Sequence, residues 1–207
     1  MTTGGRPMPV ATQAQVPAHR DHVENVVWRF AGTTMATLHV VGSNNGLDPW
    51  NQIDLSDSYA TPRADRLSEF AAREAAALAW IDAVFDQAEA SRSAGVMIAM
   101  QANPNFELPA TAQQRQGFNR VLERLGTRAQ AFGKPVLLAH GDSHYFRLDK
   151  PLRRPLAGGG TAMLENFTRV ENFGSPSVHW VEIAVDPRDP GVFRAIPHIV
   201  EGNVFQR

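Results

Sequence analysis

The middle of the chain alternates between amphipathic helical segments and short apolar runs, and this alternation constrains the fold more than any other feature. A helix is predicted over residues 61–90, because a Thr-Pro start signal precedes apolar residues at helical spacing. A second helix follows a capping-box pattern at 111–114 and ends at Gly133. An apolar run of strand length follows each helix, at 95–100 and at 134–140. This order predicts an α/β fold with parallel strands and right-handed crossovers.

The two ends of the chain carry patterns typical of antiparallel strands. Residues 25–30 and 35–41 are rich in β-forming side chains on either side of a Gly-Thr-Thr turn signal, which predicts a hairpin. Three further strands are predicted in the carboxyl third, over residues 167–173, 178–185 and 192–200. Residues 1–24 are rich in Pro, Gly, Thr and Gln and are predicted to be a flexible lead-in, so that one domain spans 25–207.

The composition argues against several classes of function. The 20 Lys and Arg residues and 21 Asp and Glu residues give a net charge of −1, so no overall positive field favours nucleic acid or an acidic membrane as a partner. The sequence has no cysteine, which excludes thiolate catalysis and cysteine-based zinc sites, so His, Asp, Glu, Asn or Gln must hold any metal. It shows no signal peptide and no apolar run near the ~20 residues of a membrane-spanning helix. The cytoplasm is therefore the default expectation, although a longer parent chain could be exported.

Three of the predicted strands end in compact polar tips. These tips are Asn44-Asn45, Gln101 with Asn103, and His140-Gly141-Asp142-Ser143-His144. Because strand ends in an open α/β sheet meet at one edge, we expect the tips to face one cleft. Imidazole and carboxylate groups suit Zn, Mn or Fe, so Asp142 and His144 are candidate metal ligands. The last tip is equally compatible with an ordinary strand that ends in a polar loop.

A serine hydrolase is a weaker alternative for the last tip. Ser143 lies between Asp142 and His144, but no Gly-x-Ser-x-Gly elbow leads into a helix there. The three glycines at 158–160 lack the Lys that precedes Ser or Thr in a phosphate-binding P-loop. The metal-site interpretation is therefore preferred to both.

Several sequence blocks, in order, resemble a bacterial branch of the calcineurin-like metallophosphoesterases. They are Leu-His-Val-Val-Gly-Ser-Asn-Asn-Gly at 38–46, Met-Gln-Ala-Asn-Pro at 100–104 and Gly-Asp-Ser-His-Tyr-Phe-Arg at 141–147. The antiparallel end at 167–181 fits the same branch, so the resemblance covers roughly residues 24–203. It implies a four-layer α/β/β/α sandwich that hydrolyses phosphate mono- or diesters at a two-metal site.

The resemblance also assigns roles to single residues. His144 matches the last His of the family's Gly-His-x-His motif, which is a metal ligand; Asp142 stands in place of the first His, and Gln101 in place of a strand-end His. His140 and Asn44 are the catalytic candidates beside these ligands. The amides of Asn45 and Asn103 would hydrogen-bond phosphate. The implied cofactor is a divalent metal such as Mn, Fe, Zn or Ni, with two ions in intact relatives.

The family's early motifs, Asp-x-His, Gly-Asp and Gly-Asn-His-Asp/Glu, do not occur in this sequence. We therefore expect the carboxyl-terminal portion of such a protein, with a sandwich that is incomplete at its amino-terminal side and with weak or no hydrolysis of its own. The alternative is a non-catalytic binding or assembly domain. It would pair through an exposed sheet edge, either with a second copy or with a partner chain.

Overall fold

The structure is a computed structural model that describes residues 8–203. Its centre is a seven-stranded mixed sheet with the strand order β1-β2-β3-β4-β5-β9-β6. In that order the strands are β1 (Val10–Thr12), β2 (Val26–Phe30), β3 (Thr33–Thr37), β4 (Val96–Ala99), β5 (Val136–His140), β9 (Phe167–Glu171) and β6 (Arg147–Asp149). Strands β3, β4, β5 and β9 pair in parallel, whereas β1, β2 and β6 add antiparallel edges.

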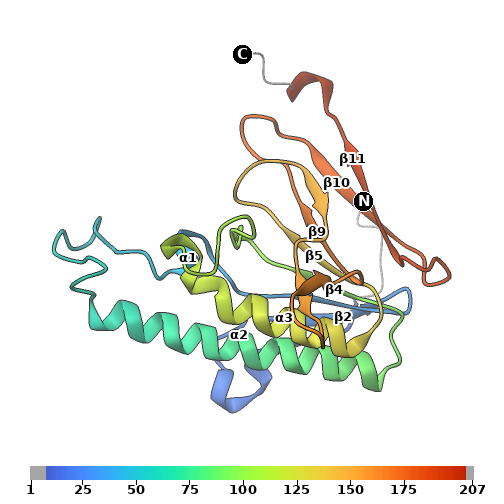
Figure 1. The fold of residues 1–207 in the computed structure, drawn as a ribbon, viewed down its shortest axis with the longest axis horizontal. Helices are drawn as coiled ribbons and strands as arrows, with labels where there is room; N and C mark the ends of the chain where they lie inside the picture. Colours follow the sequence, from blue (N-terminus) through green and yellow to red (C-terminus); the bar gives the residue numbers. More distant parts are fainter. Residues whose placement is uncertain (1–7, 204–207) are drawn as a thin grey trace, which may run out of the picture.

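Two helices, α2 (Ala64–Ala90) and α3 (Asn119–Phe132), lie side by side along one face of this sheet (Figure 1). They are the crossovers of the parallel strands, and one 3-10 turn, η3 (Gln113–Phe118), leads into α3. Shorter pieces are α1 (Gly42–Asn45) and the 3-10 turns η1 (Gln13–Gln15), η2 (Pro17–His19) and η4 (Glu201–Asn203). The α/β class predicted from the alternation of segments is therefore confirmed.

Two small hairpins complete the described chain. One joins β10 (Trp180–Val185) to β11 (Phe193–His198), and the other joins β7 (Arg153–Pro155) to β8 (Thr161–Met163). The β11 strand packs closely on the sheet at Gly95, where an added Cβ would lie 2.8 Å from the ring of Phe193. Only glycine permits this approach.

The core lies between the helices and the sheet. Alternate strand residues, such as Ile98 and Leu138, are buried against helix residues Ile81, Phe85 and Leu125. This alternation is the period of a strand that buries one face, and the helical residues recur at the spacing of one apolar stripe.

Several boundaries differ from the sequence predictions. The helix predicted to start at Thr61 begins at Ala64, and the helix predicted from 111 begins at Asn119 after η3. The capping box at 111–114 is wrong, because Ala112 precedes η3 and no side chain caps that turn. The second strand of the first hairpin is Thr33–Thr37, not 35–41, because the chain reverses at Ala31-Gly32, both with positive φ.

The flexible lead-in predicted for residues 1–24 needs correction within the described part. Residues 1–7 lie outside the residues that the structure describes, but β1 pairs with β2. Gln13 is buried; its amide donates to the carbonyl of Ala76 at 2.7 Å and accepts from Asn25 at 2.6 Å. A buried amide must satisfy its donors and acceptors, so this side chain fastens the segment to α2. Residues 8–24 therefore belong to the domain.

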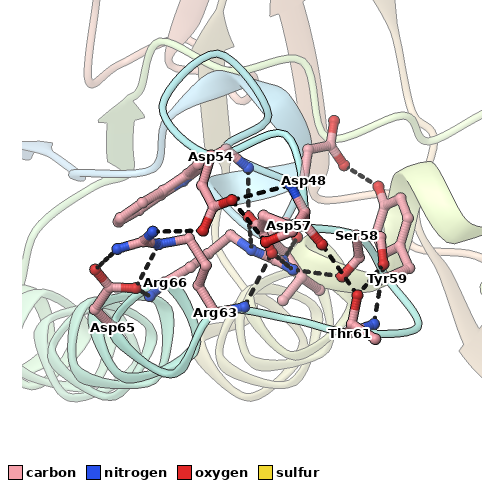
Figure 2. Close-up of polar contacts among 12 residues, drawn as sticks. Asp48, Asp54, Asp57, Ser58, Tyr59, Thr61, Arg63, Asp65 and Arg66 are labelled. Carbon is pink, nitrogen blue, oxygen red and sulfur yellow. Dashed lines mark hydrogen bonds and ion pairs between the residues drawn. The ribbon is translucent and has the colours of Figure 1, made fainter.

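The charged residues of α2 are also less exposed than predicted. Charged residues of an amphipathic helix ordinarily lie on its solvated face, yet Arg73 and Glu74 are buried, and so is Arg66, two turns before Arg73. Arg66 forms a two-pronged ion pair with Asp57, at 2.9 and 3.0 Å, which anchors the loop between α1 and α2 (Figure 2). The sequence did not reveal this pair, because its partners are separated by a loop of no regular period.

The Asp57 carboxylate is held in its charged form. Burial alone would raise its pKa, but hydrogen bonds from the Arg66 side chain and from the backbone N–H groups of Arg63 and Trp50 outweigh burial and lower the pKa to about 2. The folded pKa thus lies below the ordinary value of 3.8. Asp57 therefore contributes stability that is present above about pH 4 and is lost as the pH falls toward about 2.

We expect Asp57→Asn to lower the urea midpoint of unfolding at pH 7, because Arg66 would lose its charged partner. The difference from the parent should shrink between about pH 4 and pH 2, where the parent's own carboxylate becomes protonated. Asp21→Asn, at an exposed position, is the matched control and should change neither value. A difference that stays constant down to pH 2 would contradict this account of the ion pair.

Candidate functional site

The polar tips after β3, β4 and β5 meet at one edge of the sheet, as the sequence predicts. The Gly42 N–H donates to the Gln101 side-chain oxygen at 2.9 Å, and the Gln101 amide donates to Asp142 at 3.0 Å. The second carboxylate oxygen of Asp142 lies 3.5 Å from the Asn103 backbone nitrogen. Parallel pairing explains the meeting, because it brings the carboxyl ends of all three strands to the same side.

The backbone of these tips turns sharply. Six of the nine non-glycine residues with positive φ in residues 8–203 lie here, with φ between 52° and 80°: Ser43, Asn44, Asn45, Asn105, Asp142 and His144. Each left-handed residue costs free energy, and such residues persist only where the surrounding contacts hold them. Backbone strain of this kind gathers at functional sites, so it marks this edge as the candidate site.

Asn44 and Asn45, predicted to act on substrate, are instead buried beneath the edge. The Asn44 amide donates to the Gln113 carbonyl at 2.7 Å and accepts from the Gly117 N–H at 2.9 Å. The Asn45 amide donates to the Gly117 carbonyl at 2.9 Å and accepts from the Arg73 guanidinium. Both side chains use their donors and acceptors inside the protein. They hold η3 against α1, and a Cβ at residue 117 would lie 2.0 Å from the Asn44 carbonyl oxygen.

Asp142 and Gln101, predicted metal ligands, are both exposed and hydrogen-bonded to each other. Their oxygens are the ligand type that hard divalent cations take. This pair fits one end of a cation site, since one Asp142 oxygen has only the long contact to Asn103. Asn103 itself is half-buried, and its side-chain oxygen accepts from the Asn105 N–H at 3.1 Å.

His144, the third predicted ligand, is turned to another partner. Its Nδ1 lies 2.6 Å from the Ser175 carbonyl oxygen, and because a carbonyl only accepts, Nδ1 must carry the proton. The ring packs against Gly174 in the segment that joins β9 to β10. Among the described residues no group of three or more His, Asp or Glu side chains could hold a metal ion. Hydrogen bonds thus join Asp142 to Gln101 and His144 to Ser175, and the Nε2 of His144 is the ring nitrogen that remains for a ligand.

His140, predicted to be catalytic, is buried below the edge. Its Nδ1 is 3.1 Å from the Gly141 carbonyl, its ring lies beside Phe106, and its Nε2 has no partner within residues 8–203. Burial lowers its pKa by disfavouring the charged ring. Burial thus favours the neutral ring, and the catalytic role predicted for His140 stays a prediction.

The sequence reasoning missed the charged groups that surround His140. On β9, Arg169 and Glu171 are fully buried on the same face as Phe167. Arg169 binds Asp149 at 2.7 Å and Glu107 at 2.8 Å, while Glu171 accepts from the Ser143 hydroxyl. The Phe-x-Arg-x-Glu alternation was the available signal, because strand residues two apart share a face.

Comparison with protein-family models, with curated proteins and with solved structures gave no match to this chain. Within residues 8–203, none of the helices combines the length and the apolar character needed to cross a membrane. The candidate site therefore rests on its geometry.

We expect Asn45→Ala to destabilise the fold by about 2 kcal/mol, because it removes one acceptor of the buried Arg73 guanidinium and the side-chain amide that donates to the Gly117 carbonyl. Asn51→Ala, at an exposed position of the neighbouring loop, should change stability by less than about 0.5 kcal/mol. Urea unfolding measures both. Equal stability of the two variants would show that Asn45 is not a structural residue.

Proposed function

We propose that this chain is a metallophosphoesterase-like domain that binds phosphate esters at the carboxyl edge of its sheet, with weak or no hydrolysis of its own. The observation that carries the proposal is the chain of hydrogen bonds from Gly42 through Gln101 to Asp142. It brings together the blocks on which the family resemblance rests. In the implied four-layer sandwich, the seven-stranded sheet with α2 and α3 would be one sheet-and-helix half.

A divalent cation would bind to the oxygens of Asp142 and Gln101 together with the phosphate of the ester. Hard cations such as Mg²⁺ are commonly held by one or two carboxylates plus substrate phosphate. A pair of oxygen donors favours Mn over Zn or Ni among the candidate metals. When bound, the cation would supply positive charge to the phosphoryl oxygens, which the exposed Asp142 carboxylate alone would repel.

Weak turnover follows from how few ligands meet. Asp142 and Gln101 meet as two oxygen donors, whereas the Nδ1 of His144 donates to the Ser175 carbonyl, which leaves only its Nε2 for a cation. His140 is buried, and its Nδ1 lies 3.1 Å from the Gly141 carbonyl oxygen. A cation held by two side chains keeps most of its waters and binds loosely, so the cation and the phosphate should each depend on the other for affinity.

The proposal is tested with Mn²⁺ and inorganic phosphate in isothermal titration. We expect Mn²⁺ to bind more tightly when phosphate is present, and Asp142→Asn to weaken this binding by at least about tenfold. Asp21→Asn is the matched control: it removes an exposed carboxylate outside the candidate site and should leave the binding of Mn²⁺ and phosphate unchanged. We expect little or no hydrolysis of bis-p-nitrophenyl phosphate.

Two results would count against this reading. Rapid, chelator-sensitive hydrolysis that survives Asp142→Asn would show that other side chains hold the metal. No Mn²⁺-dependent phosphate binding at millimolar concentrations would remove the proposed site altogether.

A second candidate function is that of a non-catalytic assembly domain. It is favoured by the exposed apolar side chains near the β10–β11 hairpin, where Val178, Trp180 and Ile199 are 54%, 50% and 58% exposed. Such a surface, next to unpaired strand edges, suits a second copy of the chain. A dimer in light scattering that Trp180→Ser dissociates would support it, and a monomer at high concentration would count against it.

A further inference from the structure

A hollow of about 560 Å³ lies directly beyond the candidate phosphate site. Its wall is formed by the segment after β5 and the segment between β9 and β10, and it includes Ser143, His144, Tyr145, Phe146, Phe173 and His179. The volume falls within the range of small-molecule sites in proteins. The hollow and the phosphate site share one loop, since Asp142 contacts Gln101 and the next two residues line the hollow.

Several aromatic rings line this hollow. The rings of Phe146 and Phe173 stack with centroids 5.2 Å apart and an angle of 14° between their planes. His179 meets the edge of Phe173 at 5.0 Å, and the neighbouring Tyr145 is 63% exposed. Flat rings on a partly exposed surface are the feature that proteins use to stack planar ligands.

The two imidazoles in the hollow present opposite hydrogen-bonding groups. His144 Nδ1 donates to the Ser175 carbonyl, so in the neutral ring Nε2 is an acceptor. His179 Nδ1 accepts from the Val200 N–H at 3.2 Å, so in the neutral ring Nε2 carries the proton and is a donor. An apolar surface with a fixed donor and a fixed acceptor is typical of a site that orients a small ligand.

From this arrangement we propose that the hollow binds a planar aromatic group on the alcohol side of the phosphate ester. Asp142 and His144 are two residues apart, so their Cα atoms are at most about 7 Å from each other. A phosphate held at Asp142 and Gln101 would therefore be close enough for the alcohol group of its ester to reach the hollow that Ser143 and His144 line. The inference rests on the proposed function, and it names the ligand class of that site: aryl phosphates or nucleotides, in preference to aliphatic phosphate esters.

The test compares dissociation constants of the full chain, in the presence of Mn²⁺, for phenyl phosphate, adenosine 5′-monophosphate and glycerol 3-phosphate. We expect phenyl phosphate, the nucleotide or both to bind at least about tenfold more tightly than glycerol 3-phosphate, because one stacked ring contributes about that much. Comparison of phenyl phosphate with adenosine 5′-monophosphate shows whether the hollow prefers a simple aryl ring or a nucleotide base.

Phe173→Leu and Tyr145→Ala should each reduce this preference to less than about threefold, since they remove a stacking surface. Phe30→Leu, which changes an exposed ring on β2, is the matched control and should keep the preference. Circular dichroism establishes that each variant is folded. If Phe173→Leu does not fold, Tyr145→Ala still tests the preference, because Tyr145 is exposed and its loss should not unfold the chain. Equal affinity for all three esters, or a preference that survives both variants, would overturn the inference.

A ligand without phosphate separates this inference from the proposed function. Adenosine alone should shift the NMR signals of Phe146 and Phe173 without any Mn²⁺. If adenosine binds but no phosphate compound shows Mn²⁺ dependence, the hollow stands and the phosphate site fails. If phosphate binds with Mn²⁺ and adenosine shifts no signals, the hollow fails and the phosphate site stands.

Discussion

The structure depends first on the parallel pairing of β3, β4, β5 and β9. Parallel neighbours cannot be joined by tight turns, so the chain must return along the sheet between them. Helices α2 and α3 make two of these returns and cover the same face (Figure 1). Because every crossover starts from the carboxyl end of a strand, the loops after β3, β4 and β5 gather at one edge. That gathering, rather than any single residue, creates the candidate site.

Buried arginines fasten the loops that gather there. Arg66 binds Asp57, Arg73 binds Asn45, and Arg169 binds Asp149 and Glu107. Taking a guanidinium out of water is costly, and the cost is offset only when its donors meet carboxylates and carbonyls in good geometry. Each buried arginine is therefore compatible only with loop conformations that bring acceptors to its donors. Arg73 in this way holds Asn45, one of the left-handed residues of the tips.

The loop after β5 divides the candidate site into two parts. Asp142 faces the Gln101 amide, while His144 bonds to Ser175 in the neighbouring segment. Ser143, between them, is tied to the buried Glu171. One short loop thus borders both the oxygen donors of the proposed cation site and the aromatic hollow. This division explains why the donors predicted for one metal centre serve two different surfaces, and it links the proposed phosphate site to the proposed ligand class.

The sequence by itself determined the elements and the edge at which they meet. Apolar spacing gave α2, α3 and the central strands, because periodicity is a local property of the chain. Alternation of helix and strand then required the polar tips to converge. The sequence did not reveal β1, because its three residues are too few to show the alternating pattern of a strand.

The tertiary structure alone decided which way the side chains at that edge point. Asn44 is held by Gly117, 73 residues away, and His144 by Ser175, 31 residues away. Residue type and spacing indicate what a side chain can bind. Which partner it actually contacts depends on how distant segments pack together. For that reason Asn44 and Asn45 became supports, whereas Asp142 remained at the surface.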